Sequence, residues 1–266
     1  MGLQRAGFLV DLRDEGRVDV GRAVNQVLRF DFGDALDAEE SGADDLLRNG
    51  RLDLQAGRQR LGRRRELEES CAILGVRHLE RLEYHDSGMM GWPGNDLADA
   101  FWQMPVETAA APLVGLMERF RPDVVVTYDA NGGYGHPDHI QAHRITMHAA
   151  AVTAIPSKIY FAAIPRSIFR SLAGAFKEAG LDDFDGEDEP DFGTPDELVT
   201  TRVDCTAVVR RKLAALAAHS SQTADSFFMK LPEPLFERVF GVEHFVRHED
   251  RTGARVPESD LFAGLR

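Results

Sequence analysis

The sequence predicts an α/β fold of the Rossmann-like type, with a mostly parallel sheet and helices on both faces. Val124, Val125 and Val126 form a β-branched run typical of a strand that is covered on both sides. The glycines of Asn131-Gly-Gly then break regular structure, and Pro137 suits the first turn of a new helix. Strand, glycine loop and helix thus follow one another, as in a parallel α/β unit.

Amphipathic helices and apolar strands alternate along most of the chain. We expect a helix over residues 63–75, because Leu67, Cys71 and Leu74 recur at helical spacing and Gly75 provides a stop. The remaining expected elements are strands over 76–84, 158–164, 199–203 and 244–247, and helices over 105–120, 167–179, 205–218 (capped by Asp204) and 233–239.

Residues 1–60 differ from the rest of the chain. An apolar stretch at 7–10 could start a strand, but beyond it isolated leucines stand among Arg, Asp and Gly without a clear period. We therefore divide the chain into an atypical segment, 1–60, and one α/β domain, 61–266.

Composition excludes some functions. A net charge of −13 argues against nucleic acid or an anionic membrane as a partner, since both attract basic surfaces. No apolar run could span a bilayer and no signal peptide is visible. Cys71 and Cys205 form no CxxC pair, so we expect reduced thiols and a cytoplasmic protein.

Polar side chains gather where the central strand ends and the next helix begins. The pattern places His136 at the N-cap and Asp138 and His139 in the first turn, with His143 one turn later on the same face. Ligands bind at the carboxyl ends of strands in open α/β sheets. Histidine is the commonest metal ligand, and a neighbouring carboxylate can orient it. We interpret this segment as the functional site.

Other polar segments are ambiguous from the residues alone. Asp86, in the loop His85-Asp-Ser-Gly88, is equally well a substrate-binding carboxylate or a turn residue. His219 and Gln222 follow a predicted helix, where an exposed histidine is the better interpretation. The acidic run 182–197 is expected to be a surface loop.

The string Gly132-Gly-Tyr-Gly-His136-Pro-Asp-His139 resembles the LmbE/PIG-L family of metal-dependent de-N-acetylases. Within it, the likeness is to the mycothiol-pathway enzymes, a deacetylase of N-acetylglucosaminyl-inositol and a mycothiol S-conjugate amidase. The resemblance covers about three quarters of the chain, and its other segments begin at Arg63, Leu74, Asp86, Arg121, Ala214 and Asp260.

The resemblance implies a zinc-dependent hydrolase that acts on an amino-sugar amide or a thiol-conjugate substrate. In that case His139 is a zinc ligand, His136 is the catalytic imidazole and Asp138 is its partner. The same comparison assigns Tyr134 to the tetrahedral intermediate, and Arg63 and Asp86 to substrate hydroxyls.

The family's first strand ends in Ala-His-Pro-Asp-Asp-Glu, and this motif is absent here. Asp11, Asp14 and Glu15 stand in roughly that place without a histidine. We hypothesise a frameshifted or misassigned start for residues 1–60, which the upstream DNA would test. Three functions stay open. The protein is a deacetylase, an amidase or a non-enzymatic relative, and the segment 201–205 and the tail from Asp260 resemble the amidase.

Overall fold

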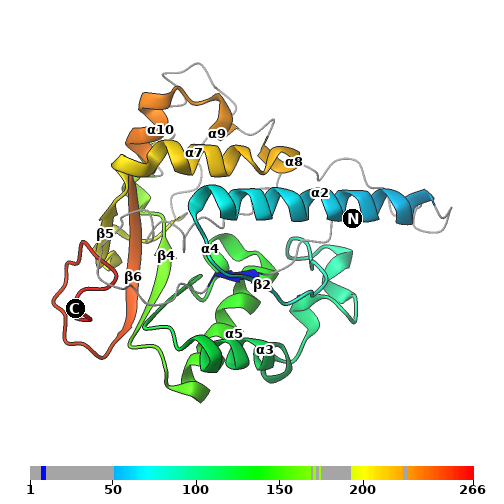
Figure 1. Cartoon of the computed structure of the whole chain (residues 1–266), viewed down its shortest axis with the longest axis horizontal. Helices are drawn as coiled ribbons and strands as arrows, with labels where there is room; N and C mark the ends of the chain where they lie inside the picture. Colours follow the sequence, from blue (N-terminus) through cyan, green and yellow to red (C-terminus); the bar gives the residue numbers. More distant parts are fainter. Residues whose placement is uncertain (1–6, 10–50, 169, 172–173, 175–192, 224–226) are drawn as a thin grey trace.

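The computed structural model describes residues 7–9, 51–168, 170–171, 174, 193–223 and 227–266 (Figure 1). The trio Asp11, Asp14 and Glu15, most of the helix expected over 167–179 and most of the acidic run 182–197 lie outside these ranges.

The central sheet has four strands in the order β3-β4-β6-β5. Only β3 and β4 are parallel, whereas β6 runs antiparallel to both β4 and β5. Their bounds are Val124–Thr127 for β3, Lys158–Ala163 for β4, Thr201–Asp204 for β5 and Val242–Asp250 for β6. The α/β class is confirmed, but the described sheet is mixed where we expected a mostly parallel one. The last residue of β5, Asp204, pairs with the first residue of β6, Val242. The segment between them therefore brings the chain back to the same end of the sheet, and β6 runs antiparallel to β5.

Helices cover both faces of this sheet, as expected. Val124 packs with α2 (Arg51–Leu74) and α7 (Val209–Ala217), while Val125 packs with α3 (Val106–Phe120) and α5 (Pro137–Thr153). Alternate residues of a strand point to opposite faces, so the valine run serves both cores. In Figure 1, α2 and α7 lie together in the upper part of the view, and α3 and α5 lie together in the lower part.

The chain before β3 differs from our expectation. The helix expected from residue 63 begins at Arg51, although it ends before Gly75, whose φ of +76° confirms the glycine stop. The strand expected over 76–84 shortens to β2 (Leu79–Arg81). It pairs antiparallel with β1 (Gly7–Leu9) in a separate two-stranded sheet. The positive φ of Glu83 turns the chain soon afterwards.

The other described elements are short. The helix expected over 205–218 begins with a 3₁₀ turn whose N-cap residue is Cys205, without a side-chain cap, so the cap expected at Asp204 was wrong. Asp204 Oδ1 instead accepts a hydrogen bond of 2.9 Å from the Thr206 backbone N–H two residues on. The short helical elements of the described ranges are η1 (Pro93–Asp96), η2 (Phe101–Gln103), α4 (Gly132–Gly135), η3 (Asp196–Leu198), η4 (Thr206–Val208), α8 (Ser220–Thr223), α9 (Phe227–Lys230) and α10 (Glu233–Phe240).

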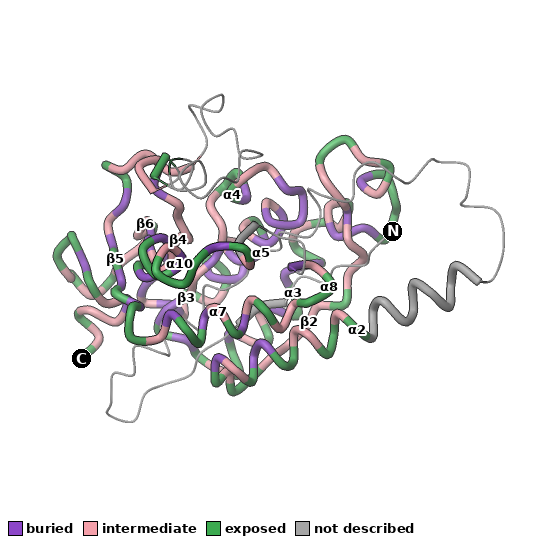
Figure 2. The backbone as a smooth tube through the Cα atoms, turned by 90° about the horizontal axis from the view of Figure 1, so that it is seen from above, coloured by how far each residue is buried: buried purple, intermediate pink, exposed green. Residues whose placement is uncertain are grey.

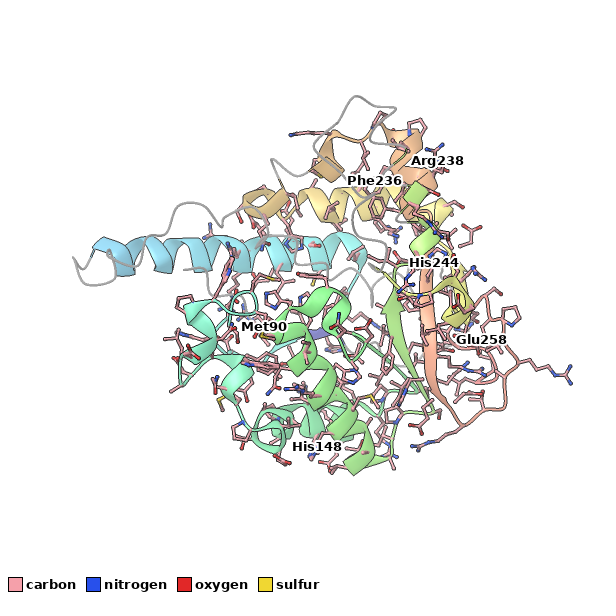
Figure 3. All side chains as sticks on the ribbon, turned by 180° about the vertical axis from the view of Figure 1, so that it is seen from behind. Met90, His148, Phe236, Arg238, His244 and Glu258 are labelled. Carbon is pink, nitrogen blue, oxygen red and sulfur yellow. The ribbon has the colours of Figure 1, made fainter. Side chains whose placement is uncertain are left out.

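A buried ionic network holds the C-terminal segment against the sheet. Glu258 accepts hydrogen bonds from Lys158 Nζ at 2.5 Å, Arg247 Nη1 at 3.0 Å, Tyr160 Oη at 2.9 Å and Thr201 Oγ1 at 3.0 Å. Lys158 begins β4, so this network lies towards the end of the strands opposite to the histidine segment. Figure 3 shows Glu258 beside the outer strands.

The distribution of buried residues follows the layers of helices and strands. Figure 2 shows buried residues along α5 and the strands, and α5 buries residues at its N-terminus, among them Asp138 and His139. Within the described ranges, no helix is long and apolar enough to cross a membrane.

Candidate active site

The site begins at the N-terminus of α5. His136 is the N-cap residue and Pro137 is the first helical residue, as the sequence predicted. The backbone N–H of Asp138 donates a hydrogen bond of 3.2 Å to Nδ1 of His136. This bond satisfies a helix N–H that has no partner within the helix and fixes the imidazole against the first turn.

The glycine loop is shaped by one carboxylate and one glycine. Asp129 Oδ1 accepts hydrogen bonds of 2.9 Å from the backbone N–H groups of Asn131 and Gly133. Gly132 has a φ of +65°, and a Cβ there would lie 2.8 Å from both His139 Cβ and the Ile140 nitrogen. Only glycine therefore fits at this position. Because it has no side chain, the backbone of the loop can lie directly against α5.

The two histidines carry their ring protons on different nitrogens. His139 Nδ1 lies 3.1 Å from the Gly132 carbonyl oxygen, which can only accept, so Nδ1 carries the proton. In the neutral ring, Nε2 of His139 then holds a lone pair. His136 Nδ1 instead accepts from an N–H, so its Nε2 carries the proton. The site thus presents one acceptor or ligand nitrogen and one N–H donor.

Aromatic rings surround this pair. Tyr128 stacks on His139 with ring centroids 4.0 Å apart and an interplanar angle of 6°. His136 and His139 are themselves stacked at 4.7 Å, and Tyr134 meets His139 edge-on at 5.2 Å. Both imidazoles are buried, His136 at 2% exposure and His139 at 6%. Polar chemistry here takes place in low dielectric, which strengthens electrostatic interactions.

A second loop reaches the same helix start. The Ser87 backbone N–H donates a hydrogen bond of 3.1 Å to Asp138 Oδ2, and both residues are buried. Ser87 Oγ accepts from the Trp102 N–H at 2.9 Å, while Asn95 Nδ2 donates to the Ser87 carbonyl at 2.5 Å. The loop after β2 is therefore rigidly held beside the histidines.

Asp86 has a turn role in this structure. Its Oδ1 accepts a hydrogen bond of 2.6 Å from the Gly88 N–H, the pattern of an Asx turn. The side chain is half-buried and adjoins Ser87, so it lies at the edge of the site.

Arg63 lies on α2 and is also half-buried. Its Nη1 atom is buried and has no hydrogen-bond acceptor among the residues that the structure describes. A buried guanidinium N–H without an acceptor is costly, which favours a role in binding a polar ligand. One helical turn on, Glu66 accepts hydrogen bonds from Ser220 Oγ at 2.9 Å and the Ser221 N–H at 2.8 Å.

Sequence reasoning missed the contacts made by Ser87, Tyr128 and Gly132. Ser87 acts through its backbone, and its proximity to Asp86 was the one available signal. The Gly132 carbonyl could have been suspected from the paired glycines. Nothing in the sequence marks Tyr128 as a stacking partner of His139.

The described residues do not by themselves complete a zinc site. Among them, no three His, Cys, Asp or Glu side chains are arranged to hold a metal ion. A catalytic zinc normally has three protein ligands. Within the described ranges, His139 offers one suitable nitrogen.

The fold and the histidine segment define a class of protein. The model of the PIG-L family, GlcNAc-PI de-N-acetylase, matches residues 24–150, which include the glycine loop and the first turns of α5. The chain belongs to this family. The match begins before residue 60, and our division of the chain there stays a prediction.

Curated relatives agree over most of the chain, and each is named 1D-myo-inositol 2-acetamido-2-deoxy-alpha-D-glucopyranoside deacetylase. The protein of Acidothermus cellulolyticus is 46% identical over 212 residues, which cover 75% of this chain and 73% of the relative. That of Geodermatophilus obscurus is 42% identical, with 79% and 78% covered. That of Thermobifida fusca is 43% identical, with 74% and 76% covered.

Proposed function

We propose that this protein is a deacetylase that hydrolyses the acetamide of an N-acetylglucosaminyl-inositol. The relatives' printed names support this substrate class. The observation that carries the proposal is the pair of stacked, buried imidazoles, one with Nε2–H and the other with a lone pair on Nε2. Amide hydrolysis needs a hydrogen-bond donor for the developing negative charge, here the Nε2–H, beside a group that can bind an electrophile, here the nitrogen with the lone pair.

His136 has the central catalytic role in this proposal. Its Nε2–H donates a hydrogen bond to the oxygen of the tetrahedral intermediate, where negative charge develops. Asp138, the assigned partner of His136, donates its backbone N–H to His136 Nδ1, and its carboxylate accepts from the Ser87 N–H, so it joins the start of α5 to the Ser87 loop. Tyr134, whose ring centroid lies 6.1 Å from that of His136, contributes its hydroxyl to the same oxygen.

Substrate hydroxyls are assigned to the two flanking residues. Arg63 offers its buried Nη1–H, and Asp86 offers its carboxylate in the loop beside Ser87. An amino sugar linked to a polyol presents many hydroxyls, so a donor and an acceptor at separate edges fit it.

Zinc is the metal that the family resemblance implies, with His139 Nε2 as its one assigned ligand. When bound, zinc activates a water molecule and polarises the amide carbonyl. The described residues fall short of a complete site, so no step of the reaction is assigned here to the ion.

The deacetylase is favoured over the amidase by where the amidase-like residues lie. Thr201, Cys205 and Leu261 are each 0% exposed, and Thr201 Oγ1 bonds Glu258. Cys205 and Leu261 are part of the hydrophobic core and Thr201 is part of the C-terminal network, so these three side chains have structural partners.

Turnover of two substrates tests the proposal. Acetate release from N-acetylglucosaminyl-inositol is compared with cleavage of a bimane-labelled mycothiol conjugate, for the parent and His136→Ala. We expect acetate release by the parent and its loss in the variant. Faster cleavage of the conjugate would make the protein an amidase, and turnover of neither substrate by the folded parent would make it a non-enzymatic relative.

A further inference from the structure

One residue outside the string 132–139, Tyr128, stacks on the ring of His139, and His143 in turn is hydrogen-bonded to Tyr128. We propose that Tyr128 and His143 are positioning residues that hold the His139 imidazole in one orientation. The inference rests on the proposed function of His139 and deepens it, because it names what keeps Nε2 facing the reaction. Neither residue is assigned a contact with substrate.

Tyr128 restricts the ring by stacking. It follows directly after β3, and its ring lies parallel to that of His139 with centroids 4.0 Å apart. The hydrogen bond from His139 Nδ1 to the Gly132 carbonyl fixes one edge of the imidazole, at 3.1 Å. A single hydrogen bond still allows the ring to tilt about that bond, whereas a parallel ring on its face does not.

His143 restricts Tyr128 in turn. Its Nδ1 lies 2.9 Å from the Tyr128 carbonyl oxygen, so Nδ1–H is the donor. His143 stands four residues after His139 on α5, on the same helix face. The hydrogen bond therefore ties the end of β3 to the helix that carries His139 and keeps the two stacked rings at a constant spacing.

The sheet supports His143 from the other side. Its ring meets Phe161 of β4 edge-on at 5.1 Å, and Phe161 stacks on His248 of β6 at 4.8 Å. A continuous set of ring contacts thus runs from β6 through β4 to α5. His143 is held by packing at its ring and by a hydrogen bond at its nitrogen, as expected of a residue that supports a functional one.

The orientation matters because a neutral imidazole can carry its proton on either ring nitrogen, and the hydrogen bond at Nδ1 decides which. If the ring of His139 turned over, the proton and the lone pair would exchange places, and the stacked pair would lose its acceptor opposite the His136 N–H. Supporting residues of functional histidines typically contribute about 10- to 100-fold in affinity or activity.

Two matched pairs of variants test the proposal. Tyr128→Leu removes the ring, whereas Tyr128→Phe keeps it and removes only the hydroxyl. His143→Leu removes the donor, whereas His143→Asn keeps an N–H close to the position of Nδ1. We expect the Leu variants to lower kcat by about 10-fold or more with a smaller change in KM. The Phe and Asn variants should stay near the parent.

The second measurement is independent of activity. Nitrogen-15 NMR of the histidine rings, with His139→Gln used for assignment, reports which nitrogen of His139 carries the proton. We expect one form, protonated at Nδ1, in the parent, Tyr128→Phe and His143→Asn, and a mixture in Tyr128→Leu and His143→Leu. Thermal unfolding checks that each variant is folded, and if Tyr128→Leu does not fold, the His143 pair decides.

A parent-like His139 spectrum in both Leu variants would overturn the proposal. Equal damage from Tyr128→Phe and Tyr128→Leu would also overturn it, since the hydroxyl would then carry the effect. If the parent lacks deacetylase activity, the proposed function fails while the NMR spectra still decide whether Tyr128 and His143 hold the ring.

Discussion

The backbone N–H of Ser87 donates to Oδ2 of Asp138, and this hydrogen bond joins a loop to a helix start 51 residues further along the sequence. It places the loop after β2 against the start of α5, so the histidine segment and the Asp86 loop form one site. Asp138 consequently has an architectural role besides the role that we propose for it as the partner of His136, and variants can separate the two.

Asp138→Ala and Asp138→Asn should differ in stability but agree in activity. Alanine leaves the buried Ser87 N–H without its acceptor, which should cost about 1–3 kcal/mol of unfolding free energy. Asparagine keeps an acceptor oxygen and should cost less. Both remove the carboxylate that we propose as the partner of His136 and should lower kcat by about 10-fold or more. Urea unfolding and acetate release measure the two effects, and full activity in Asp138→Asn would refute the catalytic role.

Gly132→Ala should damage the site, whereas Gly133→Ala should only strain the loop. Both glycines have positive φ, of +65° and +78°, so both variants carry a backbone cost of about 1–2 kcal/mol. Only at Gly132 would the Cβ lie 2.8 Å from His139 Cβ, whereas Gly133 has open space. We expect kcat/KM to fall much further for Gly132→Ala, and equal kcat/KM in the two variants would show that the close approach is unimportant.

Zinc content tests the proposed role of His139. We expect about one equivalent of zinc in the purified parent and none in His139→Ala, as measured by atomic emission. His148→Ala, a half-buried histidine further along α5, is the matched control and should retain the metal. A parent that binds no zinc would contradict the metal-dependent mechanism.

Glu258→Gln should destabilise the fold without changing the chemistry. Removing the carboxylate leaves Lys158, 0% exposed, without its closest counter-charge, and breaking a buried pair costs about 3–5 kcal/mol. Glu249→Gln, which breaks the more exposed pair with Arg251, should cost about 1 kcal/mol or less. Urea unfolding measures both, and kcat should stay at the parent value.

The same network predicts an acid-sensitive stability. Burial alone would raise the pKa of Glu258, but the hydrogen bonds from Lys158, Tyr160 and Thr201 outweigh burial and lower it. Its contribution is therefore complete above the unfolded pKa of about 4.3 and is lost as pH falls through the lower folded value. The free energy of unfolding, measured across that pH range, should depend less on pH in Glu258→Gln than in the parent.

His244 should weaken the fold on mild acidification. This residue lies near the start of β6 (Figure 3), and burial, followed by the charge of Arg202, lowers its pKa. The unfolded chain therefore binds a proton first, at a pKa of about 6.5, and the free energy of unfolding falls as pH drops below that value. In His244→Gln this decline should be shallower, and an unchanged pH dependence would contradict the assignment.

Local patterns predicted those features that depend on neighbouring residues. The N-cap at His136, the helix start at Pro137 and the stop at Gly75 each follow from backbone chemistry within a few residues. The start of α2 was placed too late, because residues 51–62 have a weak apolar period that gave no signal of a helix. Strand direction was also wrong in part, because it depends on where β6 returns to the sheet and not on its own residues.

The residues of the site were visible in the sequence, but their chemical states were not. The string around His136 and His139 was enough to indicate the family and the type of reaction, since a glycine turn, a helix start and two histidines are all local. Which nitrogen of each ring carries the proton depends on the Gly132 carbonyl and the Asp138 N–H that face it. The contacts from Ser87 and Tyr128 likewise arise only when separate segments pack together, because no short stretch of sequence encodes a distance between its own side chains and those of another loop.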